Sequence, residues 1–228
     1  MSGAIRVPVR RVTKADIVWL GEHFCRHNHT YLEHYSCFLM EKPDTAPMVE
    51  RIGIFDIETT GLPANWSIMA SWCMLDHDTG NITHDIIKRR EIRDRSDKRI
   101  VKSAVAEIAK YDRIMTWYGS RFDVPYVRTK ALYHKIPFPA FRDLYHTDLL
   151  YTARAKLRLH SNRLESVCEY FEIPAKNHKM TPKLNNDLQA GKQYALDDVL
   201  EHCKEDVWST NQVYIKLIEH TMLHKRSI

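Results

Sequence analysis

The sequence predicts an α/β domain whose mixed sheet begins as an antiparallel meander, continues with parallel strands and is flanked by helices. Three observations indicate this fold class. Residues 52–62 form an apolar, period-two run that is typical of a buried strand. Apolar stretches at residues 68–75 and 82–87 flank a turn and predict a hairpin. From residue 97 onward, helical and strand patterns alternate, which predicts parallel crossovers.

Residues 1–48 are expected to form a separate segment ahead of a domain at residues 49–228. Pro43 and Pro47 mark a loop just before the first strand. Within the segment, Thr13 resembles a helix N-cap, and a helix is expected to run from it toward Phe24.

Cysteine and histidine residues crowd the stretch that follows this helix, residues 25–37. Cysteine sulfur and histidine nitrogen are the ligands that structural zinc prefers in tetrahedral sites. One assignment gives a Cys2His2 set of Cys25, His29, His34 and Cys37. His23 and His27 compete for the same role, and the spacing differs from that of a standard zinc finger. The alternative interpretation is a histidine-rich basic surface with two ordinary cysteines.

Two carboxylates, Asp56 and Glu58, lie inside the apolar run of the first strand. Side chains two residues apart on a strand point to the same face, about 7 Å from each other. Two such carboxylates repel each other and are poorly solvated unless a cation lies between them. The pair therefore predicts a divalent metal site on the first strand.

The remaining elements follow from periodicity and from helix and turn signals. Helices are expected at residues 97–110, 122–135, 149–157, 162–171 and 197–220. Asp197 is the expected N-cap of the last helix. Strands are expected at residues 114–118 and 144–147. Residues 172–183, which include Pro174 and Pro182, are expected to form a polar loop.

Two further acidic elements lie downstream. Asp123 follows a glycine turn after the strand at residues 114–118, although an aspartate before Val-Pro is also an ordinary helix cap. His202 and Asp206 are four residues apart on the last helix, so they share one face. Taken alone, a histidine and an aspartate at that spacing are typical of a surface pair.

In this order, the three acidic elements resemble the motifs of the DEDD 3′ to 5′ exonucleases, a family with a ribonuclease H-like fold. The resemblance covers residues 50–220, and the sequence Phe-Asp-Ile-Glu-Thr-Thr-Gly-Leu at residues 55–62 matches the family's first motif. The resemblance implies that four carboxylates bind metal, namely Asp56, Glu58, Asp123 and Asp206. It also implies that Leu62 contacts the terminal base.

Residues 148–164 resemble the subgroup related to predicted bacterial ribonuclease H-like exonucleases and to the proofreading domains of family B polymerases. We interpret Asp148 as a helix cap rather than a fifth metal ligand. His202 stands at the spacing of the family's tyrosine subtype, with three residues between it and the aspartate, whereas the histidine subtype has four residues between the two. A tyrosine of pKa ~10 only orients a water near neutrality, but a histidine of pKa ~6.5 accepts its proton. We therefore expect His202 to be a general base or water-orienting residue; the alternative is that it merely packs beside Asp206.

The resemblance implies a metal-dependent 3′ to 5′ exonuclease that hydrolyses single-stranded nucleic acid, with DNA slightly favoured over RNA. Two Mg²⁺ or Mn²⁺ ions are expected to activate the attacking water and to stabilise the leaving 3′ oxygen. Substrate contacts are expected from Thr59, Leu62, Tyr118, Phe122 and Lys179. A catalytically weak nucleic-acid-binding module and an endonuclease on the same fold are the alternatives.

The composition fits a polyanionic partner. The 228 residues carry a formal net charge of +5 and the pI is near 8.9. Basic runs at residues 88–99 and 154–163 are candidates for nucleic-acid contact, although most such runs are solvated surface. Five cysteines, an odd number, argue against a disulfide framework. No apolar run suits a membrane span or a signal segment, so a cytoplasmic location is expected.

Overall fold

The computed structural model describes residues 14–41, 51–140, 143–174 and 177–220. The chain divides into two compact units, Met1–Glu50 and Arg51–Ile228. The boundary expected near residue 48 and the expected cap at Thr13 lie outside the described residues. In the part of the chain that is described, no helix is long and apolar enough to cross a membrane.

The described part of the N-terminal unit, residues 14–41, contains two short helices joined by a turn-rich loop. α1 (Lys14–Glu22) lies where a helix was expected, whereas α2 (Tyr35–Glu41) was not predicted. Between them, Phe24 and Thr30 form an isolated antiparallel bridge. Among the described residues of this unit, the buried core is small and consists of Leu20, Cys25, Tyr31, Cys37 and Phe38. Two cysteines thus occupy positions that larger apolar side chains would fill in an ordinary core.

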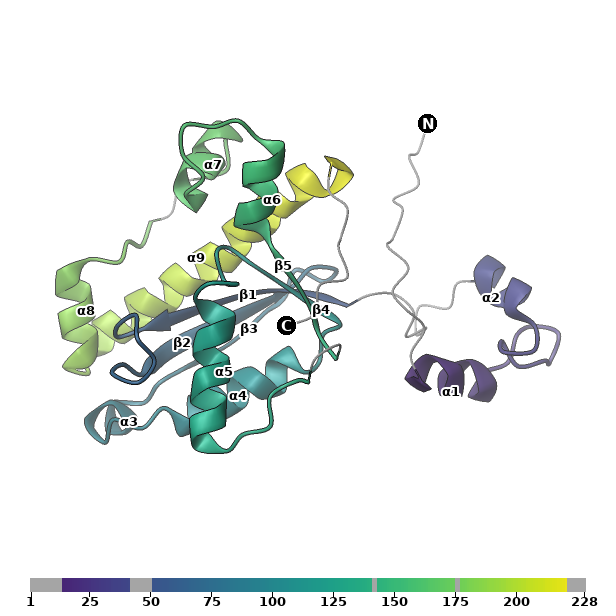
Figure 1. The fold of residues 1–228 in the computed structure, drawn as a ribbon, viewed down its shortest axis with the longest axis horizontal. Helices are drawn as coiled ribbons and strands as arrows, with labels where there is room; N and C mark the ends of the chain where they lie inside the picture. Colours follow the sequence, from purple (N-terminus) through teal and green to yellow (C-terminus); the bar gives the residue numbers. More distant parts are fainter. Residues whose placement is uncertain (1–13, 42–50, 141–142, 175–176, 221–228) are drawn as a thin grey trace. The chain divides into compact units, whose positions relative to one another are not determined.

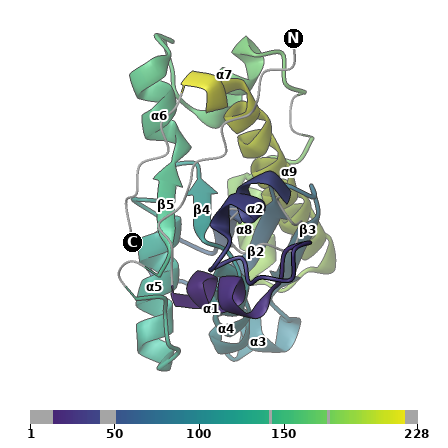
Figure 2. The ribbon, with the colours of Figure 1, turned by 90° about the vertical axis from the view of Figure 1, so that its right-hand side faces the viewer.

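The larger unit is built on a five-stranded mixed sheet with the order β3-β2-β1-β4-β5. Its strands are β1 (Ile52–Thr59), β2 (Met69–Asp76), β3 (Ile82–Ile86), β4 (Arg113–Thr116) and β5 (Tyr145–Asp148). β1, β2 and β3 pair antiparallel, whereas β4 is parallel to β1 and β5 is parallel to β4. Figure 2 shows β4 and β5 pointing the same way. The predicted fold class is confirmed.

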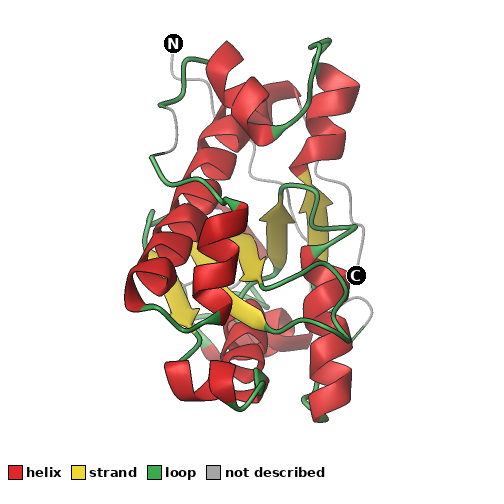
Figure 3. Cartoon of the chain, turned by 90° about the vertical axis from the view of Figure 1, so that its left-hand side faces the viewer, coloured by secondary structure: helices red, strands yellow, loops and turns green. Residues whose placement is uncertain are grey.

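Alternation along β1 separates two cores on opposite faces of the sheet. The covering helices are α4 (Lys98–Ile108), α5 (Asp123–His134) and α9 (Gln193–Leu217). Phe55 and Ile57 pack in the core with α4 and α5, and Ile54 packs in the core with α9. Figures 1 and 3 show the strands lying between these helices. Asp56 and Glu58 lie two and four residues after Ile54 on the strand, so their side chains point to the same face as Ile54, toward α9.

Shorter helices complete the described part of the unit: α3 (Arg89–Arg93), α6 (Leu149–Lys156), α7 (Leu164–Tyr170), α8 (Pro182–Gln189) and the 3₁₀ helix η1 (Ile218–His220). α3 and α8 were not predicted. The polar loop expected at residues 172–183 ends earlier, because Thr181 caps α8 by accepting from the N–H of Leu184 and Pro182 suits a first helical turn. The last helix begins at Gln193 rather than Asp197, so the expected cap was wrong.

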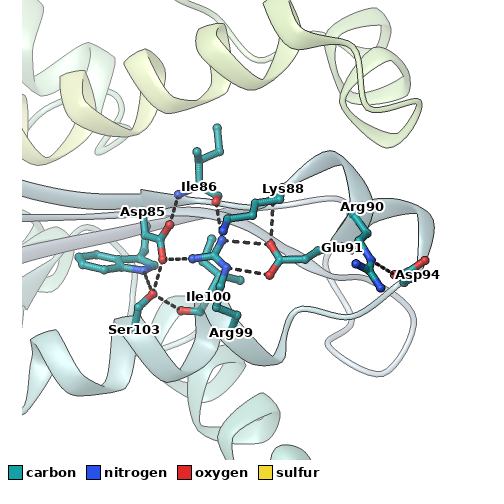
Figure 4. Close-up of polar contacts among 10 residues, drawn as sticks. Asp85, Ile86, Lys88, Arg90, Glu91, Asp94, Arg99, Ile100 and Ser103 are labelled. Carbon is teal, nitrogen blue, oxygen red and sulfur yellow. Dashed lines mark hydrogen bonds and ion pairs between the residues drawn. The ribbon is translucent and has the colours of Figure 1, made fainter.

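Arg99 on α4 forms ion pairs and a hydrogen bond with residues of β3 and α3 (Figure 4). Its guanidinium lies 2.5 Å from Asp85 Oδ2 and 2.7 Å from Glu91 Oε1, and it donates to the carbonyl oxygen of Ile86 at 2.7 Å. The hydroxyl of Ser103 donates to the same carboxylate of Asp85 at 2.6 Å. Arg99, at the end of the basic run of residues 88–99, is therefore committed to contacts within the domain.

Candidate active site

Asp56 and Glu58 lie on one face of β1, as the period-two pattern predicted, and in the structure this face is turned toward α9. The Oδ2 atom of Asp56 is buried and has no hydrogen-bond partner among the described residues. Burial raises the pKa of Asp56, and the negative charges of Asp206, Asp123 and Glu58 raise it further. A buried carboxylate oxygen with no donor, surrounded by other carboxylates, is a site that a divalent cation would stabilise.

One face of α9 carries His202 and Asp206 toward β1. His202 Nε2 lies 3.4 Å from Glu58 Oε1 and 3.7 Å from Asp206 Oδ2. One ligand atom from each of these three residues lies within 4.8 Å of the other two. The four-residue offset on the helix thus places a basic nitrogen and another carboxylate beside the carboxylates of the strand.

Asp123 reaches the same site from the first turn of α5. The N–H of Ile57 donates to Asp123 Oδ1 at 3.1 Å, so this carboxylate lies directly beside β1. Burial raises the pKa of Asp123 to about 7, against the lowering effect of backbone hydrogen bonds. The negative charges of Asp148 and Asp206 contribute to the increase. Asp123 is therefore more than an exposed helix cap.

The turn before Asp123 holds Tyr118 at φ +68°, a rare backbone conformation for an aromatic residue. Asp148 stabilises this turn, because its carboxylate accepts from the N–H groups of Tyr118 and Ser120, each at 3.0 Å, and from the Ser120 hydroxyl at 2.6 Å. Asp148 also caps α6 by accepting from the N–H of Leu150. The structural role expected for Asp148 is confirmed, and the same side chain also shapes the turn.

A groove of about 600 Å³ opens beside the carboxylates. It is lined by Asp56, Ile57, Leu62, Pro63, Trp117, Tyr118, Arg121, Phe122 and Asp123. Leu62 and Tyr118 are 77% and 47% exposed, so both present free apolar surface. Of the substrate contacts expected from the sequence, Leu62, Tyr118 and Phe122 line the groove. Arg121 was not predicted, although it lies inside the same short motif as Tyr118 and Asp123.

Thr59 and Lys179, also expected to contact substrate, are not among the residues that line this groove. The hydroxyl of Thr59 donates to the carbonyl oxygen of Gly61 at 2.9 Å and shapes the loop after β1. Lys179 Nζ lies 3.3 Å from Glu165 Oε1 at an exposed position. Contact of Thr59 and Lys179 with substrate stays a prediction.

Glu205 on α9 holds the segment before α8 against the site. Its carboxylate accepts from the N–H groups of Asn177 and His178 at 3.2 and 3.1 Å, and from His178 Nδ1 at 3.0 Å. The carbonyl oxygen of His178 in turn accepts from His202 Nδ1 at 2.8 Å. Sequence reasoning missed this chain of contacts, because no periodic pattern connects residues so far apart along the chain.

The N-terminal unit brings together a second group of possible metal ligands, namely Cys25, His27, His34 and Cys37. The expected set is corrected at one position, since His27 replaces His29. A tight turn explains the change: the N–H of Asn28 donates to the carbonyl oxygen of Cys25, and the N–H of Cys25 donates to that of His29, each at 2.9 Å. The backbone of His29 therefore faces Cys25, while its ring lies edge to face on His34.

The chain belongs to the RNase H superfamily, whose family model matches residues 54–218. The superfamily that the acidic motifs resemble is thus confirmed, and this is the fold of nucleases that process nucleic acid and usually use divalent metal ions. Among solved structures, the chain is similar to the family B DNA polymerase from the hyperthermophilic archaeon Pyrobaculum calidifontis, with a TM-score of 0.60 and 18% sequence identity. The similarity covers 77% of this chain and 25% of the polymerase chain, and it concerns the fold. No curated protein matches the sequence.

Proposed function

We propose that the protein is a metal-dependent 3′ to 5′ exonuclease that acts on single-stranded nucleic acid. The observation that carries the proposal is a group of carboxylates and one imidazole beside a groove with aromatic walls. The members of this group are Asp56, Glu58, Asp123, His202 and Asp206. Phosphodiester hydrolysis needs such oxygen ligands for metal and a proton acceptor for water. Membership of the RNase H superfamily and the similarity to a DNA polymerase support the proposal.

Asp56, Glu58, Asp123 and Asp206 would hold two Mg²⁺ or Mn²⁺ ions. The buried Asp56 Oδ2, which lacks a hydrogen-bond partner among the described residues, fits the role of a ligand atom. Carboxylate oxygens favour Mg²⁺ and Mn²⁺ over softer metals. When bound, such ions lower the pKa of an attacking water and stabilise the leaving oxygen.

His202 accepts the proton of the attacking water at Nε2. Because the carbonyl oxygen of His178 can only accept a hydrogen bond, His202 Nδ1 carries a hydrogen and Nε2 is the basic nitrogen of the neutral ring. Nε2 faces Glu58 and Asp206, next to the proposed ligands. Its direction is therefore fixed before substrate arrives, which reduces the cost of orienting the base.

The groove would hold the 3′ end of the strand. Tyr118 and Phe122 offer aromatic faces for stacking, worth ~1–3 kcal/mol per base, and Leu62 offers an apolar contact. Arg121 Nε donates to the hydroxyl of Tyr151 on α6 at 3.3 Å. This hydrogen bond connects the groove to α6, whose last residues begin the basic run of residues 154–163. The exposed side chains of that run, at residues 154–163, would neutralise phosphates upstream of the 3′ end.

The proposal is tested with 5′-labelled single-stranded DNA and RNA whose 3′ ends are free or blocked, together with a circular single strand. With Mg²⁺ or Mn²⁺ we expect stepwise shortening of free 3′ ends and release of mononucleotides, with DNA slightly preferred. EDTA and Asp56→Ala should each abolish the reaction. Cleavage of the circular strand would identify an endonuclease, and binding without cleavage of any substrate would identify a binding module. Either result contradicts the proposal.

A further inference from the structure

We propose that Cys25, His27, His34 and Cys37 bind one zinc ion, and that this ion holds residues 14–41 in their fold. The four residues belong to the N-terminal unit, which is separate from the unit that carries the carboxylates. The proposal is therefore independent of the nuclease activity proposed above. It also differs from it in chemistry, because sulfur and nitrogen ligands suit zinc and carboxylate oxygens suit Mg²⁺ or Mn²⁺.

The distances between the ligand atoms match a tetrahedral zinc centre. Bonds of about 2.3 Å to sulfur and about 2.0 Å to nitrogen, at a tetrahedral angle, place sulfur and nitrogen about 3.5 Å apart. Cys25 Sγ lies 3.9 Å from His27 Nδ1 and 3.7 Å from His34 Nδ1. Cys37 Sγ lies 3.2 Å from His27 Nδ1 and 3.6 Å from His34 Nδ1. All four sulfur–nitrogen distances thus lie within about 0.4 Å of the value for a tetrahedral zinc centre.

The same distances indicate a single ion. In a Rieske-type cluster the two cysteines bind one iron and the two histidines bind the other, which separates sulfur from nitrogen. Here sulfur and nitrogen are close in every combination, and all four atoms lie within 4.8 Å of one another. Cys25 and Cys37 are free thiols, so a disulfide does not hold them together. Two thiolates balance the charge of Zn²⁺, and two neutral imidazoles complete its coordination.

A tight turn and the start of a helix position the four ligands. Cys25 and His27 lie in a tight turn in which Asn28 adopts φ +61°. His34 lies directly before α2 and Cys37 lies in its first turn, where the N–H of Cys37 donates to the carbonyl oxygen of His34 at 3.0 Å, and residues three apart on a helical turn share one side. A turn and a helix start therefore direct one cysteine and one histidine each toward the same point.

The unit also needs such an ion, because little else stabilises it. Apart from the two cysteines, the buried apolar residues in its described part are Leu20, Tyr31 and Phe38, with Trp19 partly buried against them. A unit as small as Met1–Glu50 rarely has enough hydrophobic core to be stable alone, and small natural domains usually add disulfides, a metal ion or oligomerisation. Since zinc ligands rarely form a site in the unfolded chain, the free energy of zinc binding becomes free energy of folding.

The first test is the metal content of the full-length chain after expression with added zinc. We expect about one zinc per chain in the wild type, and less than about a fifth of that in His27→Ala and in Cys37→Ser. His29→Ala is the matched control, because it removes a histidine two positions away, and it should keep about one zinc. Asp56→Asn should also keep it, which separates this site from the carboxylates. A wild type without zinc, or loss of zinc in His29→Ala rather than His27→Ala, overturns the assignment.

A second measurement keeps the proposal testable if the cysteine variants fold poorly. Cobalt(II) exchanged into the wild-type chain should give the intense visible bands of a tetrahedral site with thiolate ligands, and His27→Ala should lack them. Zinc removal by a chelator should raise the rate of proteolytic cuts within residues 14–41 at least tenfold, while residues 51–217 stay resistant with Mg²⁺ restored. A weak octahedral cobalt spectrum, or unchanged cutting within residues 14–41, overturns the proposal.

Discussion

His202 Nδ1 lies 2.8 Å from the carbonyl oxygen of His178, so the orientation of the imidazole is fixed by a backbone atom from a different segment of the chain. Glu205, one turn further along α9, accepts from the N–H and ring of His178 and holds that backbone in place. The result is that Nε2 faces Glu58 and Asp206. The direction of the proposed base therefore depends on α9 and on the segment before α8 together.

Replacing His202 by alanine is expected to lower kcat by ~10²–10⁴-fold with little change in KM, because the proton acceptor is lost while the groove remains. His202→Tyr should retain part of the rate, since a phenol can still orient the water. Single-turnover hydrolysis of a 5′-labelled single strand at neutral pH measures both variants. An alanine variant with the wild-type rate would exclude His202 from catalysis.

Glu205→Gln is expected to lower kcat by roughly 10-fold and to leave KM nearly unchanged, as for groups that orient a catalytic residue without touching substrate. The neutral amide binds the two N–H groups near residue 177 less strongly, so the carbonyl that holds His202 becomes less well placed. Glu201→Gln is the control, because Glu201 lies on the same helix and pairs with Lys204. An equal decrease in kcat for Glu205→Gln and Glu201→Gln would argue against a positioning role for Glu205.

Asp123→Asn is expected to stabilise the metal-free protein near pH 8. Burial raises the pKa of Asp123 to about 7 in the folded state, above an unfolded value of about 3.9. The folded protein thus retains a proton that the unfolded chain loses between pH ~4 and ~7, so this group lowers stability as pH rises through that window.

Asparagine removes the charge and keeps an oxygen for the N–H of Ile57. We expect the Tm of the metal-free variant at pH 8 to exceed that of the wild type by on the order of 5 °C. Added Mn²⁺ should raise the Tm of the wild type far more than that of the variant. The exposed Asp78→Asn serves as control. A lower Tm for metal-free Asp123→Asn would contradict the expected cost of this buried charge.

Tyr118→Ala is expected to weaken binding of a single strand by about 5- to 100-fold, which corresponds to loss of one stacked base. Tyr118→Phe keeps the ring and should bind nearly as the wild type does. Fluorescence anisotropy in an Asp206→Asn background separates binding from cleavage. Tyr133→Ala, which removes a 78% exposed tyrosine on α5 that does not line the groove, should have no effect. Unchanged binding by Tyr118→Ala would remove this ring from the substrate site.

Asp97→Asn is expected to destabilise the domain by about 3 kcal/mol at pH 7, because it leaves a buried ammonium without its counter-ion. Lys130 Nζ and His134 Nε2 lie 2.8 and 2.6 Å from the two oxygens of Asp97, which is 2% exposed. Burial alone would raise the pKa of Asp97, but these partners and the N–H of Met69 lower it below its usual value.

This contribution is present above the unfolded pKa of about 3.9 and is lost as pH falls through the lower folded value. The difference in unfolding free energy between the wild type and Asp97→Asn should therefore shrink below pH ~4. Urea denaturation at pH 7 and at pH 3 measures it. A difference that stays constant across this range would show that the carboxylate's charge is not the source of the stability.

The sheet could be predicted from the sequence because β1 shows a period of two, β2 is buried along its whole length and reads as an apolar run, and turn signals lie between the apolar runs. The helices that escaped prediction, α2, α3 and α8, are short, with five to eight residues each. Thr181 and Pro182 resemble a loop sequence, yet they begin α8. Lys192 precedes α9 without a side-chain cap, so the start of that helix at Gln193 is set by packing against the sheet rather than by a local signal.

The sequence by itself predicted which acidic residues and which histidine share a face of their strand or helix at the candidate site. Alternation placed Asp56 and Glu58 on one face, and the helical offset placed His202 and Asp206 on one face, because both periods are properties of the local backbone. Tertiary structure alone decided what these faces meet. It placed His202 against the carbonyl oxygen of His178. In the N-terminal unit it placed His27, and not His29, in the group of Cys25, His34 and Cys37. The tight turn at Asn28 sets these side-chain directions, which ligand type and spacing do not encode.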